Sequence, residues 1–163
     1  MRTWMRLGVV FLLALLVQLT VFVDVRIAGV APELLALLAV IAGFFVGPDR
    51  GPVIAFAAGL LWDVYLPTPL GVSAITFAVV AFAVGSLNEG LFHDTRSQLM
   101  LVAGVASAST VIGYALLGSI LGESGLIGAH MLVVAFVVGL INAVVAPLAA
   151  PLMAWALAGD VQR

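Results

Sequence analysis

Side chains that could carry chemistry are few in this sequence, and they are widely separated. The chain has no Cys, which excludes disulfides, thiolate metal sites and Cys nucleophiles. His93 and His130 are too far apart in sequence to form a metal-binding motif. The sequence also contains no paired carboxylates, no Ser-His-Asp arrangement and no phosphate-binding loop. We therefore expect no enzymatic activity, no metal site and no cofactor.

Asp63 is the most informative ionisable residue, because it follows a long apolar stretch in the segment GLLWDVYLPTPLG. A carboxylate inside a bilayer is costly, so such residues usually face the interior of a helical bundle or mark a functional site. Two interpretations stay open. Asp63 either lies at headgroup level near Trp62 and Tyr65 and holds the turn that contains Pro69 and Gly71, or it is a buried functional carboxylate.

Other polar side chains lie within apolar segments. Asn142, Ser107 and Gln18 are examples, and their default role in lipid is hydrogen bonding between helices, worth about 0.6–2 kcal/mol each. His130 lies at the start of the last apolar segment. We interpret it as an interfacial histidine rather than as a ligand.

The composition requires a bilayer as the solvent for most of the surface. Of 163 residues, 64% are hydrophobic and 9% are charged, and the mean hydropathy is +1.31. A soluble domain averages about 45–50% apolar and about 25% charged residues. A net charge of -2 without a basic patch argues against a nucleic-acid partner. Because the apolar segments lack period-two alternation, we expect one all-α integral membrane domain over residues 1–163.

Polar residues, prolines and glycines divide the chain into six apolar segments. A helix needs about 20 apolar residues to cross roughly 30 Å of hydrocarbon. The predicted spans are 4–23, 32–47, 51–66, 70–87, 98–121 and 130–157. Two alternatives stay open, although we favour six spans. The first segment could be a cleaved secretory signal, and the short second and third segments could form a re-entrant hairpin.

The arginines indicate the orientation in the membrane. With six spans and a cytoplasmic N-terminus, every arginine except Arg26 lies on the cytoplasmic side. An excess of Arg in cytoplasmic loops is the positive-inside distribution. We therefore expect both termini to be cytoplasmic.

Small residues recur along one face of each of the last two spans. Gly104 lies on such a face in the fifth span and Gly139 in the sixth. Small residues let helices approach closely in lipid. We interpret these faces mainly as packing within the bundle, and docking of a partner's helix is the alternative.

One part of the chain, from Pro32 to Gly71, is more specific than its composition. It contains Pro32-Glu33-Leu34, a short charged turn at Asp49-Arg50-Gly51, then Gly59-Leu60-Leu61-Trp62-Asp63 and Pro69-Leu70-Gly71. This pattern resembles the family of the rod shape-determining protein MreD, in which Asp is commoner than the Glu found here at position 33. Length and six-span layout match along the whole chain, while the motif itself is confined to this segment.

The resemblance implies a non-enzymatic scaffold of the bacterial cell-elongation machinery. Such a protein would be a six-transmembrane-helix bundle in the plasma membrane that binds MreC. It would act near the actin-like MreB, the glycosyltransferase RodA and the penicillin-binding transpeptidase that accompanies RodA.

Two other functions stay open. The helix arrangement of this family is similar to that of the substrate-binding subunits of energy-coupling-factor transporters, so a vitamin-binding subunit is the main alternative. A lipid-handling protein, with Asp63 and Asn142 along a headgroup path, is a third interpretation. The candidates for structural or partner-binding roles are Asp63, Pro69, Gly71, Gly59, Gly104, Gly139 and Asn142.

The arginine distribution generates a topology prediction. Reporter fusions at the N-terminus, at Asp49-Arg50, in the loop 88–97 and at the C-terminus should all report a cytoplasmic location. A reporter placed near Arg26 should report the opposite side and serves as the control. A periplasmic location for Asp49-Arg50 would contradict the six-span topology.

Overall fold

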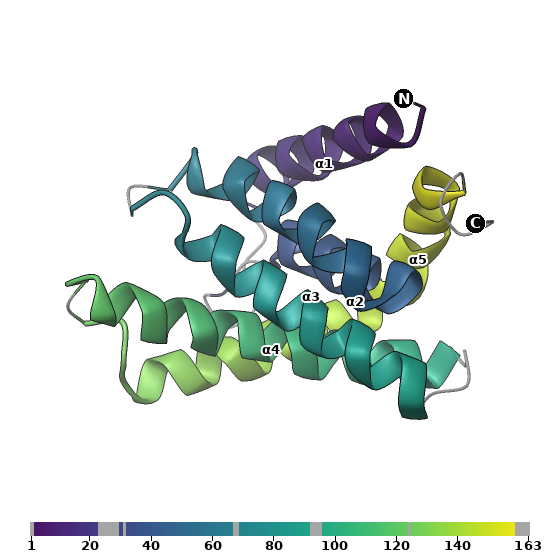
Figure 1. Ribbon diagram of the computed structural model, residues 1–163. Helices are drawn as coiled ribbons and strands as arrows, with labels where there is room; N and C mark the ends of the chain where they lie inside the picture. The colour runs from purple at the N-terminus through teal and green to yellow at the C-terminus, as the bar shows by residue number, and fades with distance from the viewer. Residues whose placement is uncertain are drawn as a thin grey trace.

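The described part of the chain contains five helices in the computed structural model, which describes residues 2–22, 30, 32–66, 69–91, 96–123 and 125–158. The helices are α1 (Arg2–Thr20), α2 (Leu34–Asp63), α3 (Val72–Leu91), α4 (Arg96–Ile120) and α5 (Ala129–Leu157) (Figure 1). Four segments are long and apolar enough to cross a membrane: Thr3–Thr20, Leu34–Asp63, Arg96–Ile120 and Ala129–Leu157. The chain is therefore an all-α, multi-pass membrane protein.

The prediction of six separate helices is wrong for the described residues, because the predicted spans 32–47 and 51–66 form one element, α2. The other predicted spans agree with the observed helices to within a few residues. We expected the segment 47–52 to break the helix, yet only Gly47 departs from helical geometry, with φ 74° and ψ -172°. Pro48 then resumes the helix, in a position where the missing N–H of proline removes no helical hydrogen bond.

Gly47 turns α2 back on itself, as Figure 1 shows. A Cβ atom on Gly51 would lie 2.6 Å from Cα of Gly43. A straight helix would separate these two residues by about 12 Å. The two arms, 34–46 and 48–63, therefore lie against each other at the bend.

The arm 34–46 forms the centre of the bundle. All residues from 35 to 44 are buried, and all four other helices contact α2. A helix that is apolar on every side belongs in the interior of a bundle. At about 1.5 Å per residue this arm is roughly 20 Å long, which is shorter than roughly 30 Å of hydrocarbon. Only one of its two ends can therefore reach a surface of the membrane.

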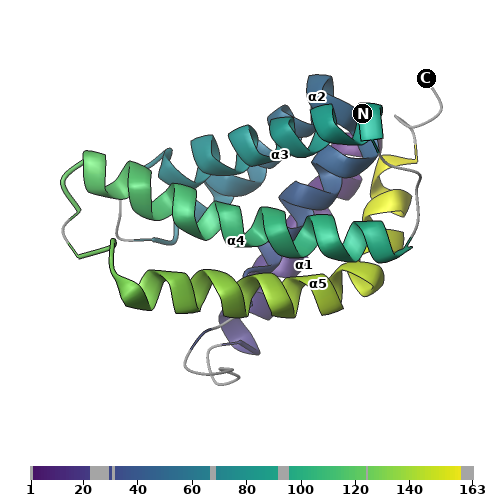
Figure 2. The same cartoon turned by 90° about the horizontal axis from the view of Figure 1, so that it is seen from below.

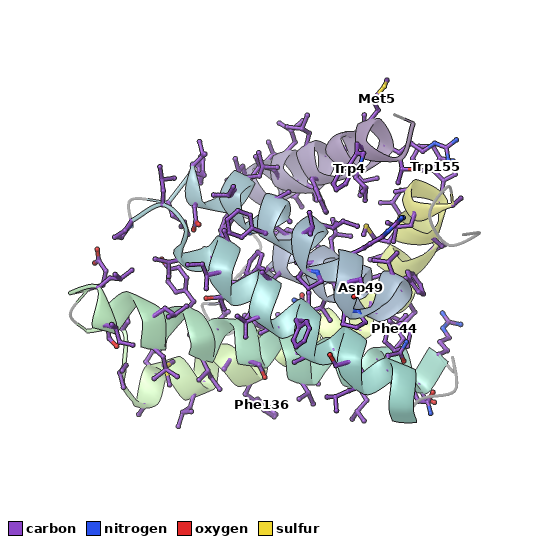
Figure 3. All side chains as sticks on the ribbon, in the orientation of Figure 1. Trp4, Met5, Phe44, Asp49, Phe136 and Trp155 are labelled. Atoms are coloured by element: carbon purple, nitrogen blue, oxygen red, sulfur yellow. The ribbon has the colours of Figure 1, made fainter. Side chains whose placement is uncertain are left out.

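The outer helices expose large apolar side chains that a protein in water would bury. Figure 3 shows Phe136 pointing away from the body of the molecule, and this side chain is 70% exposed. It belongs to a row on α5 at four-residue intervals: Leu132, Phe136, Leu140, Val144 and Leu148. In lipid such a face is in contact with acyl chains, so its exposure has no hydrophobic cost.

The start of α1 and the end of α5 lie at the same end of the bundle, together with the bend of α2, the end of α3 and the start of α4 (Figures 1 and 2). Arg6 on α1 joins this end to α5, because its guanidinium lies 5.0 Å from the ring centroid of Trp155 and donates to the Trp155 main-chain oxygen at 3.3 Å. Arg50 follows the bend and Arg96 begins α4. The arginines with described side chains therefore share one end.

Gly47 should be sensitive to substitution because of its positive φ. A residue with a Cβ rarely adopts this backbone conformation, so Gly47→Ala should lower the free energy of unfolding by about 1–3 kcal/mol. Gly8→Ala is the matched control, because a Cβ there meets no atom within 4 Å. Thermal unfolding in detergent measures both variants. Equal melting temperatures for the two variants would contradict the role of Gly47 as the hinge of α2.

Candidate functional site

Asp63 holds the start of α3. Its side chain is 1% exposed. Oδ2 accepts hydrogen bonds from the N–H groups of Gly71 at 2.8 Å and Ala74 at 3.2 Å, and Oδ1 accepts one from Ser73 at 3.0 Å. The first N–H groups of a helix have no helical partner and favour a negative charge. The expectation that this carboxylate bonds to the backbone and holds the turn is confirmed.

The turn between Asp63 and α3 depends on two glycines. Gly71 has φ +105°, a conformation that residues with a Cβ rarely adopt. A Cβ on Gly59 would lie 2.4 Å from Cα of Ala74, so Gly59 lets the end of α2 approach the start of α3. Pro69 is exposed at the beginning of the turn. The contacts of Asp63, Gly59 and Gly71 are thus internal, and a partner-binding role for them stays untested.

Three amide side chains bond to the backbone at the ends of the central arm of α2. Gln18 of α1 accepts, through Oε1, the N–H groups of Leu34 at 2.9 Å and Leu35 at 3.3 Å. Asn142 of α5 donates to the Glu33 main-chain oxygen at 3.2 Å. At the other end, Asn88 of α3 donates to the Phe44 main-chain oxygen at 2.8 Å. Figure 3 labels the side chain of Phe44.

Asn142 also links α5 to α4. Its Nδ2 donates to the hydroxyl oxygen of Ser107 at 3.0 Å, and both residues are fully buried. The hydrogen bonding between helices predicted for Asn142, Ser107 and Gln18 is confirmed, since Gln18 of α1 bonds to the backbone of α2. These contacts hold the bundle together.

Gly104 and Gly139 face each other across the contact between α4 and α5. A Cβ on Gly104 would lie 3.1 Å from the Gly139 main-chain oxygen, and a Cβ on Gly139 would lie 2.7 Å from the Gly104 oxygen. Figure 2 shows α4 and α5 running side by side. The small-residue faces therefore serve packing within the bundle, which was the favoured interpretation. Docking of a partner at these glycines is not tested by this arrangement.

A small cavity with polar groups in its lining lies between α2, α3 and α4, and it was not predicted from the sequence. Its volume is about 120 Å³, and it is lined by Glu33, Trp62, Leu66, Ser73, Phe77, Thr110 and Tyr114. These residues come from three separate parts of the chain, so no sequence spacing connects them. Pockets for drug-sized ligands and cofactors are typically about 300–1,000 Å³. This cavity is therefore too small for a vitamin.

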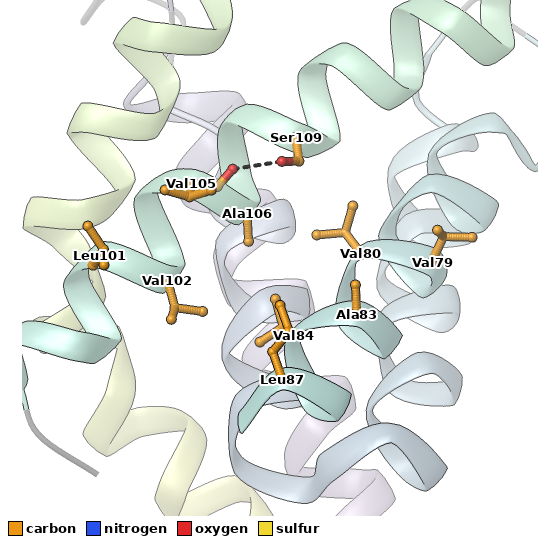
Figure 4. A pocket seen from close by; sticks show the side chains of 10 residues that line it. All are labelled: Val79, Val80, Ala83, Val84, Leu87, Leu101, Val102, Val105, Ala106 and Ser109. Carbon is orange, nitrogen blue, oxygen red and sulfur yellow. Dashed lines mark hydrogen bonds between the residues drawn. The ribbon is translucent and has the colours of Figure 1, made fainter. Parts of the chain in front are cut away.

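A larger groove between α3 and α4 is almost entirely apolar (Figure 4). Its volume is about 300 Å³, and its walls include Val80, Ala83 and Leu87 from α3 and Leu101, Val102 and Val105 from α4. Ser109 is the one lining residue with a hydroxyl group, and that hydroxyl donates to the Val105 main-chain oxygen at 2.9 Å. The groove thus offers no free hydrogen-bond donor to a ligand, and its lining suits an apolar occupant.

Comparison with known proteins gives one match. The model of the family described as rod shape-determining protein MreD matches residues 1–156. No curated protein and no solved structure matches the chain. The likeness to substrate-binding subunits of energy-coupling-factor transporters, expected from the resemblance, therefore has no structural support.

Substitutions of Asp63 should be graded in their effect on stability. Asp63→Asn keeps one acceptor oxygen but points an NH₂ group at a backbone N–H, so it should cost about 1–3 kcal/mol. Asp63→Leu leaves all three N–H groups without an acceptor, at about 1–3 kcal/mol for each. Thermal unfolding in detergent should therefore rank wild type above Asn and Asn above Leu. The exposed Asp49→Asn is the control for loss of charge alone. If Asp63→Leu unfolds at the wild-type temperature, Asp63 does not hold the start of α3.

Proposed function

Because the chain belongs to the family of the rod shape-determining protein MreD, we propose that it is a non-enzymatic membrane scaffold that binds MreC in the cell-elongation machinery. A role in determining rod shape follows from the family. A scaffold function with binding of MreC is the more specific part of the proposal. Through MreC, the protein would position the peptidoglycan-synthesis proteins RodA and its transpeptidase partner in relation to MreB.

The groove between α3 and α4 is the observation that carries the proposal. A transmembrane helix of a partner is apolar along its length, and helices commonly bind in the groove between two others. Ala83 on the wall of the groove is small and exposed, so it allows close approach of a second helix. The groove lining is apolar apart from Ser109, which supports packing in lipid rather than chemistry as the means of recognition.

We also propose six crossings of the plasma membrane, with both termini in the cytoplasm. The sharp bend at Gly47 gives α2 two arms that run in opposite directions, so α2 counts as two crossings (Figure 1). The grouping of Arg6, Arg50 and Arg96 at one end of the bundle supports a cytoplasmic location for that end. Arm 34–46 can be shorter than the membrane is thick because protein surrounds it on all sides. Non-helical backbone at its ends is tolerated within the membrane when protein buries it.

Filling the groove should weaken MreC binding without unfolding the protein. Ala83→Trp adds a large side chain to an exposed position on the groove wall, so it should reduce co-purification of MreC about ten-fold or more, since a clash of about 1–3 kcal/mol changes affinity by that order. Ala57→Trp is the matched control, because Ala57 is an exposed alanine on α2 that does not line the groove.

Both variants should keep the wild-type melting temperature in detergent, and Ala57→Trp should keep MreC. Normal MreC recovery with a correctly folded Ala83→Trp variant would exclude the groove as the docking surface. Restoration of rod shape in cells that lack the native protein then tests the scaffold function itself, and it should follow MreC binding across the variants.

A further inference from the structure

We propose that the polar cavity between α2, α3 and α4 binds a primary ammonium group. This inference goes beyond the scaffold function and does not depend on it. The cavity combines a carboxylate from Glu33, hydroxyl groups from Ser73 and Thr110 and an aromatic ring from Trp62. Each of these groups favours a compact cation that donates hydrogen bonds.

The carboxylate of Glu33 is available to a ligand because another side chain makes the hydrogen bonds that an N-cap side chain usually makes. Glu33 is the N-cap residue of α2, yet its side chain makes no capping hydrogen bond. Gln18 accepts the Leu34 and Leu35 N–H groups instead. The Asn142 side chain donates a hydrogen bond to the Glu33 main-chain oxygen and so holds the Glu33 main chain in place. Within the described residues no cation pairs with this carboxylate, and a charged group away from water requires a partner.

Both hydroxyl groups can supply an acceptor oxygen to a ligand. The Ser73 side chain is 1% exposed, and its Oγ has no hydrogen-bond partner among the described residues. The Thr110 hydroxyl donates its hydrogen to the Ser107 main-chain oxygen at 2.7 Å, which leaves its oxygen free to accept. An unpaired buried hydroxyl is unfavourable, so Ser73 Oγ marks a position where a ligand atom would bind.

An ammonium group matches these acceptors in charge and in hydrogen-bonding character. It carries three N–H donors and no acceptor, and the cavity lining holds one carboxylate and, besides the Tyr114 hydroxyl, the hydroxyl oxygens of Ser73 and Thr110. The aromatic ring of Trp62 adds a surface that attracts cations. The volume of about 120 Å³ accommodates an ammonium on a short carbon chain but no large amine. The same group occurs in free ethanolamine and in the headgroup of phosphatidylethanolamine.

The first experiment uses free ethanolammonium chloride as the probe. Titrated into the detergent-solubilised full chain at constant ionic strength, it should raise the melting temperature of the wild type in a saturable way. Glu33→Gln should lose the effect, and Ser73→Ala should weaken the apparent affinity roughly ten-fold, as loss of one hydrogen bond to a charged group does. Glu123→Gln is the matched control, because Glu123 lies in the loop after α4 and does not line the cavity.

Two results would overturn the proposal. One is an equal shift for Glu33→Gln and wild type. The other is an equal shift of the wild type with tetramethylammonium chloride, which has the charge but cannot donate a hydrogen bond. The second test needs no variant, so it decides the matter even if Glu33→Gln fails to fold.

A second experiment distinguishes the lipid from the free amine. The protein is placed in nanodiscs of phosphatidylglycerol with either phosphatidylethanolamine or phosphatidylcholine. If the headgroup is the ligand, phosphatidylethanolamine alone raises the melting temperature and abolishes the shift by free ethanolammonium. If the free amine is the ligand, it acts equally in both nanodiscs. Absence of a shift in every arm contradicts the proposal. MreC co-purification with Glu33→Gln should be unchanged, which separates this test from that of the scaffold function.

Discussion

The structure depends on one constraint, which is that backbone N–H and C=O groups away from water must find partners inside the protein. The constraint is most severe for the central arm 34–46, because this short helix is buried from residue 35 to residue 44. Gln18 and Asn88 meet it at the two ends by bonding to backbone groups of Leu34, Leu35 and Phe44. Asp63 meets the same constraint at the start of α3. Most of the few polar side chains in the interior are therefore structural.

This use of polar residues explains why residues that suggest chemistry in the sequence do not perform it. Asp63 is buried, as a functional carboxylate would be, but both of its oxygens are occupied by backbone N–H groups. Glu33 is the contrasting case, because Gln18 has taken over the capping of α2. A buried acid that is not needed for capping remains available to a ligand. The distinction depends on which neighbour reaches each helix end, and that is visible only in three dimensions.

The sequence predicted the positions of the helices well, because apolar length decides them. It predicted poorly the features that depend on local backbone geometry or on packing. Apolar length and the flanking polar residues located the helices. The segment 47–52 was misread, because the effect of Pro48 depends on whether it interrupts a helix or begins one, and Gly47 decided for the latter. The backbone bonding of Asp63 followed from its place before a proline- and glycine-containing turn. The cavity could not be predicted, since Glu33, Ser73 and Thr110 are brought together only by the packing of three helices.

Glycines make two of the helix contacts closer than the contact between α3 and α4, and both candidate binding surfaces lie along the latter. Glycines bring backbones together between α2 and α3, at Gly59 and Ala74, and between α4 and α5, at Gly104 and Gly139. Between α3 and α4 a Cβ on Gly113 would meet a side-chain methyl group of Thr76 rather than backbone. The polar cavity and the apolar groove both open along this α3–α4 contact. Because a close backbone contact leaves no space for a ligand, the two candidate surfaces lie where side chains rather than backbone separate α3 from α4.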